Sequence, residues 1–178
     1  MWETGGVFQI ASETRRYNLE VLGISETHWT QVGQQRLDLG ELLLYSGHEE
    51  EDAPYTQGVT LMLSKQAQNA LIGWESHGPM VSKASFKTKK GGVSMNVIQC
   101  YAPTNDYNED AKNQFYNRLQ SIVEKCPTKD LTILMKISMP MLERTTLDMK
   151  TSWDDTDWEK GTKMVRDSQT YVRSVNWS

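Results

Sequence analysis

LEVLGISETHW, residues 19–29, carries the clearest structural signal in this sequence. Residues 19–25 form a short apolar run without a polar face, which favours a strand covered on both sides over a surface hairpin. Glu26 follows at the carboxyl end of that strand, where open α/β sheets place their sites. The position suits a magnesium ligand, although an acidic residue that merely ends a strand is the commoner explanation. His28 and Trp29, taken singly, are interpreted as packing and surface residues.

The segments on either side of this strand predict an α/β fold. Apolar residues at helical spacing indicate a helix over 4–16, and a longer apolar stripe that ends before Pro127 indicates a second helix over 109–126. The turn KKGG, residues 89–92, favours a hairpin because glycine readily adopts positive φ. Short apolar runs between turn residues predict strands at 41–46, 58–64, 70–75, 80–88, 93–101 and 131–135.

The composition indicates one intracellular domain. The chain has 178 residues, of which 38% are hydrophobic, and this is enough for a packed core. A net charge of -4 argues against a protein that holds DNA by charge alone, but a magnesium enzyme is less constrained, because acidic groups hold its metal. Cys100 and Cys126 lack the spacing of a disulfide framework or a zinc site. We expect a nuclear or cytoplasmic protein with no membrane contact and no obligate protein partner.

Two short motifs resemble a known superfamily. ETHW at 26–29 and QCYAPT at 99–104 are similar to motifs of the endonuclease/exonuclease/phosphatase superfamily, in its apurinic-endonuclease-like branch. Over residues 2–135 the chain more closely resembles the endonuclease part of non-LTR retrotransposon endonuclease/reverse transcriptase proteins, some of which are labelled craniofacial development protein 2-like. The segments that carry this resemblance, in the family's order, are LEVLGISETHW, GHEEEDAPYTQGVTLMLSK, NALIGWESHG, KASFKTKK and MNVIQCYAPTND.

The resemblance implies a partial endonuclease domain over residues 1–135. Its expected fold is an incomplete four-layered α/β sandwich, roughly the first half of the parent fold. The implied activity is hydrolysis of a DNA phosphodiester with Mg²⁺ as cofactor and DNA as partner. Glu26 matches the family's metal-binding glutamate, and Tyr101 matches the tyrosine of its YxP motif, whose phenol can hydrogen-bond a phosphate oxygen. Without the resemblance, Tyr101 is interpreted as an aromatic residue anchoring a loop.

Other catalytic groups of the family are weak or absent here. Thr104 and Asn105, just after the YxP motif, are the weaker candidates for nucleic-acid contacts. The family continues its last strand with the motif GDxN, whereas Met135 is followed here by KISM, residues 136–139. The family's late aspartate–histidine pair also has no counterpart. The sequence therefore predicts an inactive remnant of the endonuclease.

Residues 136–178 differ in character from the rest of the chain. They hold four methionines and three tryptophans without sustained apolar periodicity, so we expect a mostly disordered, non-family tail. Residues 154–163 could form at most a marginal helix. Without the second half of the domain, the strands at 19–25 and 131–135 are expected to have open edges, with low stability as a result.

A reading frame shifted by one nucleotide would explain the tail. Residues 137–141, ISMPM, can be encoded by ATC TCA ATG CCA ATG. The neighbouring frame then reads GAT CTC AAT GCC AAT, which spells DLNAN and restores a GDxN-like motif. Methionine and tryptophan have single codons and restrict the reconstruction further along, but other codons were chosen freely. The frameshift is therefore a hypothesis that the coding DNA tests.

Two alternatives to an inactive remnant remain open. The first is a non-catalytic DNA-binding module, in which the hairpin and its lysines still contact DNA. Salt-dependent binding to duplex DNA would separate it from a simple remnant. The second is a nuclease completed by another chain. The lysines of the first alternative are Lys83, Lys87, Lys89 and Lys90.

Overall fold

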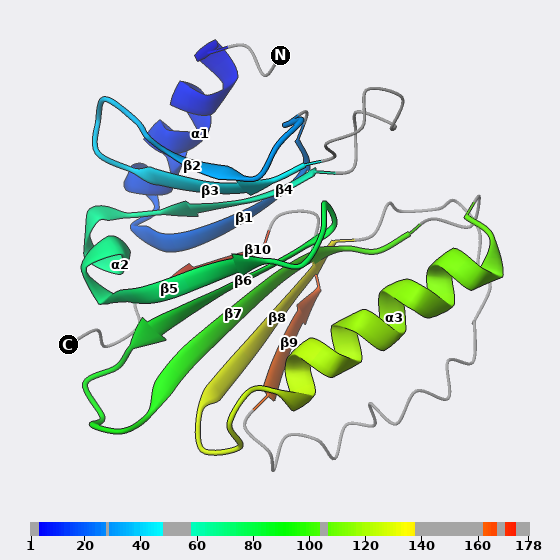
Figure 1. The fold of residues 1–178 in the computed structure, drawn as a ribbon. Helices are drawn as coiled ribbons and strands as arrows, with labels where there is room; N and C mark the ends of the chain where they lie inside the picture. The colour runs from blue at the N-terminus through cyan, green and yellow to red at the C-terminus, as the bar shows by residue number, and fades with distance from the viewer. Residues whose placement is uncertain are drawn as a thin grey trace.

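The computed structural model describes residues 4–27, 29–47, 58–103, 107–137, 162–166 and 170–173. Two five-stranded sheets, here called sheet A and sheet B, pack face to face, and a helix covers the outer face of each (Figure 1). The order of layers is therefore helix, sheet, sheet, helix. This arrangement confirms the expected α/β class and is compatible with an incomplete four-layered sandwich.

Sheet A contains the strand that the sequence marks most clearly. Its strand order is β10-β1-β4-β3-β2, and all neighbouring strands in it are antiparallel. β1 lies between β4 and β10, so it is paired at both edges. Val21 is buried between the sheets, and Leu19 and Leu22 are buried on the α1 side, as expected for a strand covered on both faces. The strands are β1 Leu19–Thr27, β2 Gly33–Arg36, β3 Leu42–Ser46, β4 Gly58–Leu63 and β10 Thr170–Arg173.

Sheet B has the order β5-β6-β7-β8-β9 and mixes two kinds of pairing. The β5, β6 and β7 strands form an antiparallel meander, whereas β8 is parallel to both of its neighbours. A parallel pair needs a crossover, and α3 provides it between β7 and β8. The elements are β5 Leu71–Ser76, β6 Val81–Lys87, β7 Ser94–Tyr101, α3 Glu109–Glu124, β8 Leu131–Ile137 and β9 Thr162–Arg166.

The main core lies between the sheets because alternate side chains of each strand point to the same face. Ala67 and Ala70 of the short helix α2, Lys65–Ala70, close one end of this core. Ser64 caps α2, and its hydroxyl accepts the backbone N–H of Ala67 at 3.1 Å. The strand side chains of the core include Val21, Leu44, Leu61, Leu63, Phe86, Met95, Val97 and Met135.

The outer helices each bury one apolar stripe. On the first helix, α1 Thr4–Arg16, Val7 and Ala11 pack toward Met62 of sheet A. On α3 the predicted stripe is confirmed, with Phe115, Leu119 and Ile122 buried against sheet B.

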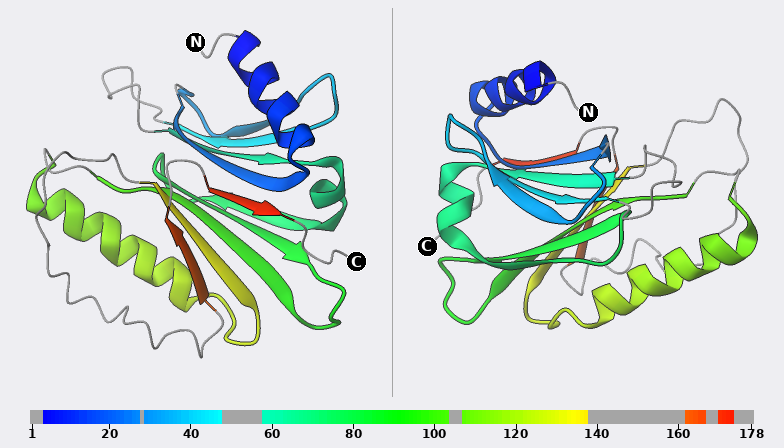
Figure 2. Two further views of the ribbon diagram at one scale, coloured as in Figure 1. Left: turned by 180° about the vertical axis from the view of Figure 1, so that it is seen from behind. Right: turned by 45° about the horizontal axis from the view of Figure 1, so that its top comes forward.

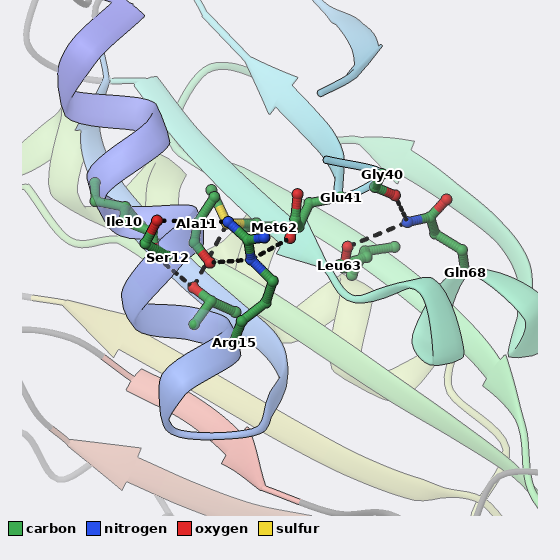
Figure 3. Close-up of polar contacts among 10 residues, drawn as sticks. Ile10, Ala11, Ser12, Arg15, Gly40, Glu41, Met62, Leu63 and Gln68 are labelled. Atoms are coloured by element: carbon green, nitrogen blue, oxygen red, sulfur yellow. Dashed lines mark hydrogen bonds and ion pairs between the residues drawn. The ribbon is translucent and has the colours of Figure 1, made fainter. Parts of the chain in front are cut away.

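α1 is also held to sheet A by a polar contact (Figure 3). Arg15 Nε lies 3.0 Å from Glu41 Oε1, and the Glu41 side chain is only 5% exposed. The Thr14 hydroxyl bonds back to the carbonyl oxygen of Ile10 at 2.8 Å. Nearby, Gln68 Nε2 donates to the Gly40 carbonyl oxygen at 2.8 Å, which ties the β2–β3 turn to α2. Burying a carboxylate costs free energy unless a cation pairs with it. The ion pair with Glu41 therefore holds Arg15, and with it α1, at this place on sheet A.

Two elements before the tail were not expected from the sequence. β2 has the sequence GQQR, which contains no apolar residue to mark a strand, and α2 is too short to show a helical period. The helices and strands that the sequence predicted up to residue 135 are confirmed to within about two residues at each end. α3, for example, ends at Glu124 rather than at residue 126.

The expectation that the tail does not pack is wrong for two segments. β9 pairs with β8, and β10 pairs with β1, so neither β8 nor β1 is left with an open edge (Figure 2). The physical reason is that a strand edge offers unpaired N–H and C=O groups to any extended segment that reaches it. The expected marginal helix at 154–163 lies outside the described residues except for its last two, which begin β9.

Within the described residues, no helix is both long and apolar enough to cross a bilayer.

Cys100 and Cys126 are both free and buried. Burial raises the pKa of the Cys100 thiol to about 12, so this thiol is protonated and unreactive near neutral pH.

Candidate functional site

Glu26 lies at an irregularity in β1. The β1–β4 pairing shifts between Ser25 and Thr27, so that Glu26 has no partner of its own on β4. Its φ is 58°, in the left-handed region that non-glycine residues rarely adopt. Such a bulge redirects a side chain, and bulges are over-represented next to active sites. Here the bulge directs the Glu26 carboxylate toward sheet B.

Tyr101 is the last residue of β7 and faces sheet A. The residue is 5% exposed and packs against Val59. Its backbone N–H donates to the carbonyl oxygen of Met80 at 2.9 Å, which extends the β6–β7 pairing to the strand end. The tyrosine is thus fixed by backbone pairing and by packing, as the anchoring interpretation of the sequence also expected.

The structure brings Glu26 and Tyr101 together from different sheets. The Tyr101 phenol donates a hydrogen bond to Glu26 Oε1 at 3.3 Å. Burial, followed by the negative charge of Glu26 and this hydrogen bond, raises the pKa of Tyr101 above its ordinary value. The phenol therefore remains protonated at neutral pH and can act as a hydrogen-bond donor.

Two further polar groups near this pair were missed by the sequence analysis. The Tyr107 hydroxyl is buried and has no hydrogen-bond partner, and Tyr107 contributes to the raised pKa of Tyr101. Gln99 lies two residues before Tyr101 on β7, is fully buried, and has no partner for either amide atom. A Cβ added to Gly23 would lie 2.1 Å from Gln99 Oε1, so the amide occupies space that only glycine leaves free. No sequence signal distinguishes these two residues from ordinary strand and loop residues.

The residue at which the resemblance leads us to expect the GDxN aspartate is paired with Tyr101. Ile137 follows Lys136, and in the parallel β7–β8 register it pairs with Tyr101. The ammonium of Lys136 contacts Tyr116 of α3, whose hydroxyl is 3.4 Å away. The chain therefore has an isoleucine paired with the tyrosine, at the position where the resemblance leads us to expect a carboxylate.

The donor set of the described residues does not fit a complete magnesium site. Mg²⁺ prefers octahedral oxygen coordination, usually with carboxylates, waters and substrate phosphates. Glu26 supplies one carboxylate, and one of its oxygens already accepts the Tyr101 hydrogen bond. Among the described residues, no three histidine, cysteine, aspartate or glutamate side chains gather closely enough to hold a metal ion. His28, Thr104 and Asn105 lie outside the described residues.

The hairpin lysines lie elsewhere. Lys87 ends β6, and Lys89 and Lys90 are exposed in the turn that follows, at the opposite end of β7 from Tyr101. Lys83 lies in the middle of β6, opposite Glu75 on β5 and Ile98 on β7. Lys83 therefore lies apart from the turn that carries Lys89 and Lys90, four residues before Lys87 on the same strand.

Comparison with known proteins identifies curated relatives. Over 126 residues the chain is 31% identical to craniofacial development protein 2 of Bos taurus. The aligned part covers 71% of this chain and 20% of that protein. The protein of the same name from Tragulus javanicus gives 31% identity over 126 residues, covering 71% of this chain and 21% of its own length. The chain is homologous to craniofacial development protein 2 over this segment.

This homology confirms the part of the resemblance that concerns craniofacial development protein 2. The chain spans about a fifth of the length of the craniofacial development protein 2 sequences that it matches. No family model matches the chain. No solved structure matches it either.

Proposed function

We propose that this chain is the amino-terminal part of a DNA endonuclease domain from a non-LTR retrotransposon, and that it no longer hydrolyses DNA. The proposal assigns the chain to the endonuclease/exonuclease/phosphatase superfamily. The main support is the 3.3 Å hydrogen bond between Tyr101 and Glu26, because it joins the two residues that the superfamily motifs mark independently. These residues are 75 positions apart in sequence, so their contact is a property of the fold.

In an intact site of this kind, each residue has a distinct task. Bound Mg²⁺ would supply charge that stabilises the transition state of phosphodiester hydrolysis. The Glu26 carboxylate would contribute one oxygen ligand. The protonated phenol of Tyr101 would donate a hydrogen bond to a phosphate oxygen of DNA and hold it in place. In this chain the phenol donates to Glu26, so DNA would have to displace that contact.

The proposed loss of turnover follows from the missing partners. Orienting a water molecule and the leaving group requires several groups converging on the reacting phosphate. Ile137 has no donor or acceptor in its side chain, and it occupies the strand position beside Tyr101. The Tyr101 phenol alone can donate to a phosphate oxygen, but one donor and one carboxylate cannot position a nucleophile.

A plasmid-nicking assay tests this proposal. Purified full-length chain is incubated with supercoiled plasmid and Mg²⁺, with the Glu26→Ala variant as a matched control. We expect no nicking above background from either protein. Nicking by the unmodified chain that disappears in Glu26→Ala would refute the loss of activity, while supporting the assignment of Glu26.

A non-catalytic DNA-binding module is the second candidate. The observation in its favour is the exposure of Lys87, Lys89 and Lys90 around one turn. Binding to duplex DNA that weakens steeply with salt and is lost when these three lysines are replaced by glutamine would support it. Lys83→Gln is the matched control, since Lys83 lies away from the turn.

A further inference from the structure

An open pocket of about 500 Å³ lies at the end of sheet B opposite Tyr101. The β6–β7 turn forms one wall and the loop between α3 and β8 forms the other, and Figure 1 shows both at the same end of the sheet. Pockets for small ligands are typically about 300–1,000 Å³. This pocket is therefore large enough for a ligand of nucleotide size.

Each wall of the pocket carries an exposed lysine. Lys87 comes from the end of β6, and Lys129 comes from the loop before β8. Lys89 and Lys90 extend the positive charge beyond Lys87 along the turn. The chain as a whole has a net charge of -4, so this end is locally cationic on an acidic protein. Such a concentration of charge attracts small anions.

The acidic residue in the pocket has a structural partner. Asp130 is 9% exposed, and its Oδ1 accepts the backbone N–H of Ser94 at 2.9 Å. This bond attaches the α3–β8 loop to the first residue of β7, so the two walls are held together. Asp130 reduces the positive charge of the pocket but leaves the lysines in excess.

The turn itself is ordered and exposes its backbone. The Thr88 hydroxyl donates to the Val93 carbonyl oxygen at 2.7 Å, and the Val93 N–H donates to the Lys90 carbonyl oxygen at 3.1 Å. Gly91 and Gly92 have no side chains, and an added Cβ at either would meet no atom within 4 Å. A ligand can therefore approach the glycine backbone closely.

We propose that this pocket binds a small phosphorylated ligand of the nucleoside triphosphate class. Lys87 and Lys129 would hold the phosphates from opposite walls, since ammonium groups are effective phosphate ligands. Val93 and Pro127, which also line the pocket, would contact the organic part of the ligand. A hollow suits a small molecule better than duplex DNA, whose surface is convex. The proposal does not depend on the Glu26–Tyr101 site.

Calorimetric titration of the full chain with ATP, in buffer without Mg²⁺, tests the proposal. We expect ATP to bind, and the affinity to fall at least about tenfold when Lys87 and Lys129 are both replaced by glutamine. The corresponding double replacement by arginine keeps the positive charge and should retain binding. All these changes are at exposed positions, so thermal unfolding should be unchanged.

The matched control is Lys83→Gln, which removes a lysine from the same strand outside the pocket. It should bind ATP as the unmodified chain does. Absence of ATP binding, or equal affinity in the double glutamine variant, would overturn the proposal. Binding of a short DNA duplex but not of ATP through Lys87 and Lys129 would also overturn it, in favour of the DNA-binding alternative.

Discussion

Ile137 pairs with Tyr101 in the parallel register of β7 and β8, at the carboxyl ends of both strands. Because Tyr101 also contacts Glu26, a carboxylate at position 137 would be delivered to the same neighbourhood. We predict that Ile137→Asp tightens Mg²⁺ binding roughly tenfold, since a second carboxylate increases both the charge and the number of oxygen ligands. Isothermal titration with MgCl₂ measures this change. The control is Ile137→Asn, which has similar size but no charge, and equal affinity in the two variants would contradict the prediction.

The bulge at Glu26 predicts a backbone effect on stability. With φ at 58°, any residue with a Cβ is strained there, whereas glycine is not. Glu26→Gly should therefore be more stable than Glu26→Ala by about 1 kcal/mol, measured by urea unfolding. Asn18→Gly is the control: Asn18 has a similar φ of 51°, but asparagine tolerates this φ better, so the gain in stability on changing it to glycine should be smaller. A glycine variant no more stable than the alanine variant would show that the local backbone is relaxed.

The amide of Gln99 is buried without hydrogen-bond partners, and removing it should stabilise the protein. Gln99→Met preserves the shape of the side chain and removes two unsatisfied polar atoms, for an expected gain of about 1–3 kcal/mol in the free energy of unfolding. The exposed Gln120 on α3 is the control position, where the same change should have little effect. Loss of stability in Gln99→Met would mean that the amide has a partner in solution.

His77 predicts a decrease in stability in mild acid. Burial lowers its pKa and outweighs the nearby Glu75 carboxylate, which lies 3.1 Å from the ring and raises it. The charges of Lys83 and Lys125 also lower the pKa, and Arg118 donates to the His77 carbonyl oxygen. The folded state thus binds fewer protons than the unfolded state below about pH 6.5, so stability is lost as the pH falls.

Urea unfolding between about pH 7.5 and 5.5 tests this effect. The unmodified chain should lose more stability over this range than His77→Gln, which cannot titrate. The comparison between the two proteins removes the contribution of the carboxylates common to both. Parallel pH profiles would show that His77 has the same pKa in the folded and unfolded states.

The unusual composition of residues 136–178 predicts a specific nucleotide change. If one nucleotide was lost just after the Met135 codon, the neighbouring frame of the gene should encode a GDxN-like motif at this point. Sequencing the coding DNA through residue 178 tests the hypothesis directly. A neighbouring frame without that motif would require another origin for the tail.

The strand ends that carry Glu26 and Tyr101 could be predicted from local apolar runs, whereas the roles of the two residues come from the resemblance and stay a prediction. Glu26 follows LEVLGIS and Tyr101 follows MNVIQC, so both strands are visible locally and the motifs mark their ends. The bulge at Glu26 was not predictable, because it depends on the register with β4. The position of Lys129 beside the hairpin was also missed, since it depends on the α3 crossover and not on local pattern.

The tail strands show a different limit of sequence analysis. TKMVR and TYVR are too short to stand out, and their pairing depends on the edges offered by β8 and β1. The β8 edge lies 30 positions before β9, and the β1 edge lies at the other end of the chain from β10. A periodicity argument considers one segment at a time and cannot detect such partners.

β9 belongs to sheet B and β10 to sheet A, and only residues 167–169 separate them in sequence. The chain also passes from sheet A to sheet B through α2, between β4 and β5. Two short connections thus join the sheets covalently. Short connections raise the effective concentration of one sheet at the surface of the other. Sliding of one layer over the other would pull on these two connections, so the sandwich should resist shear.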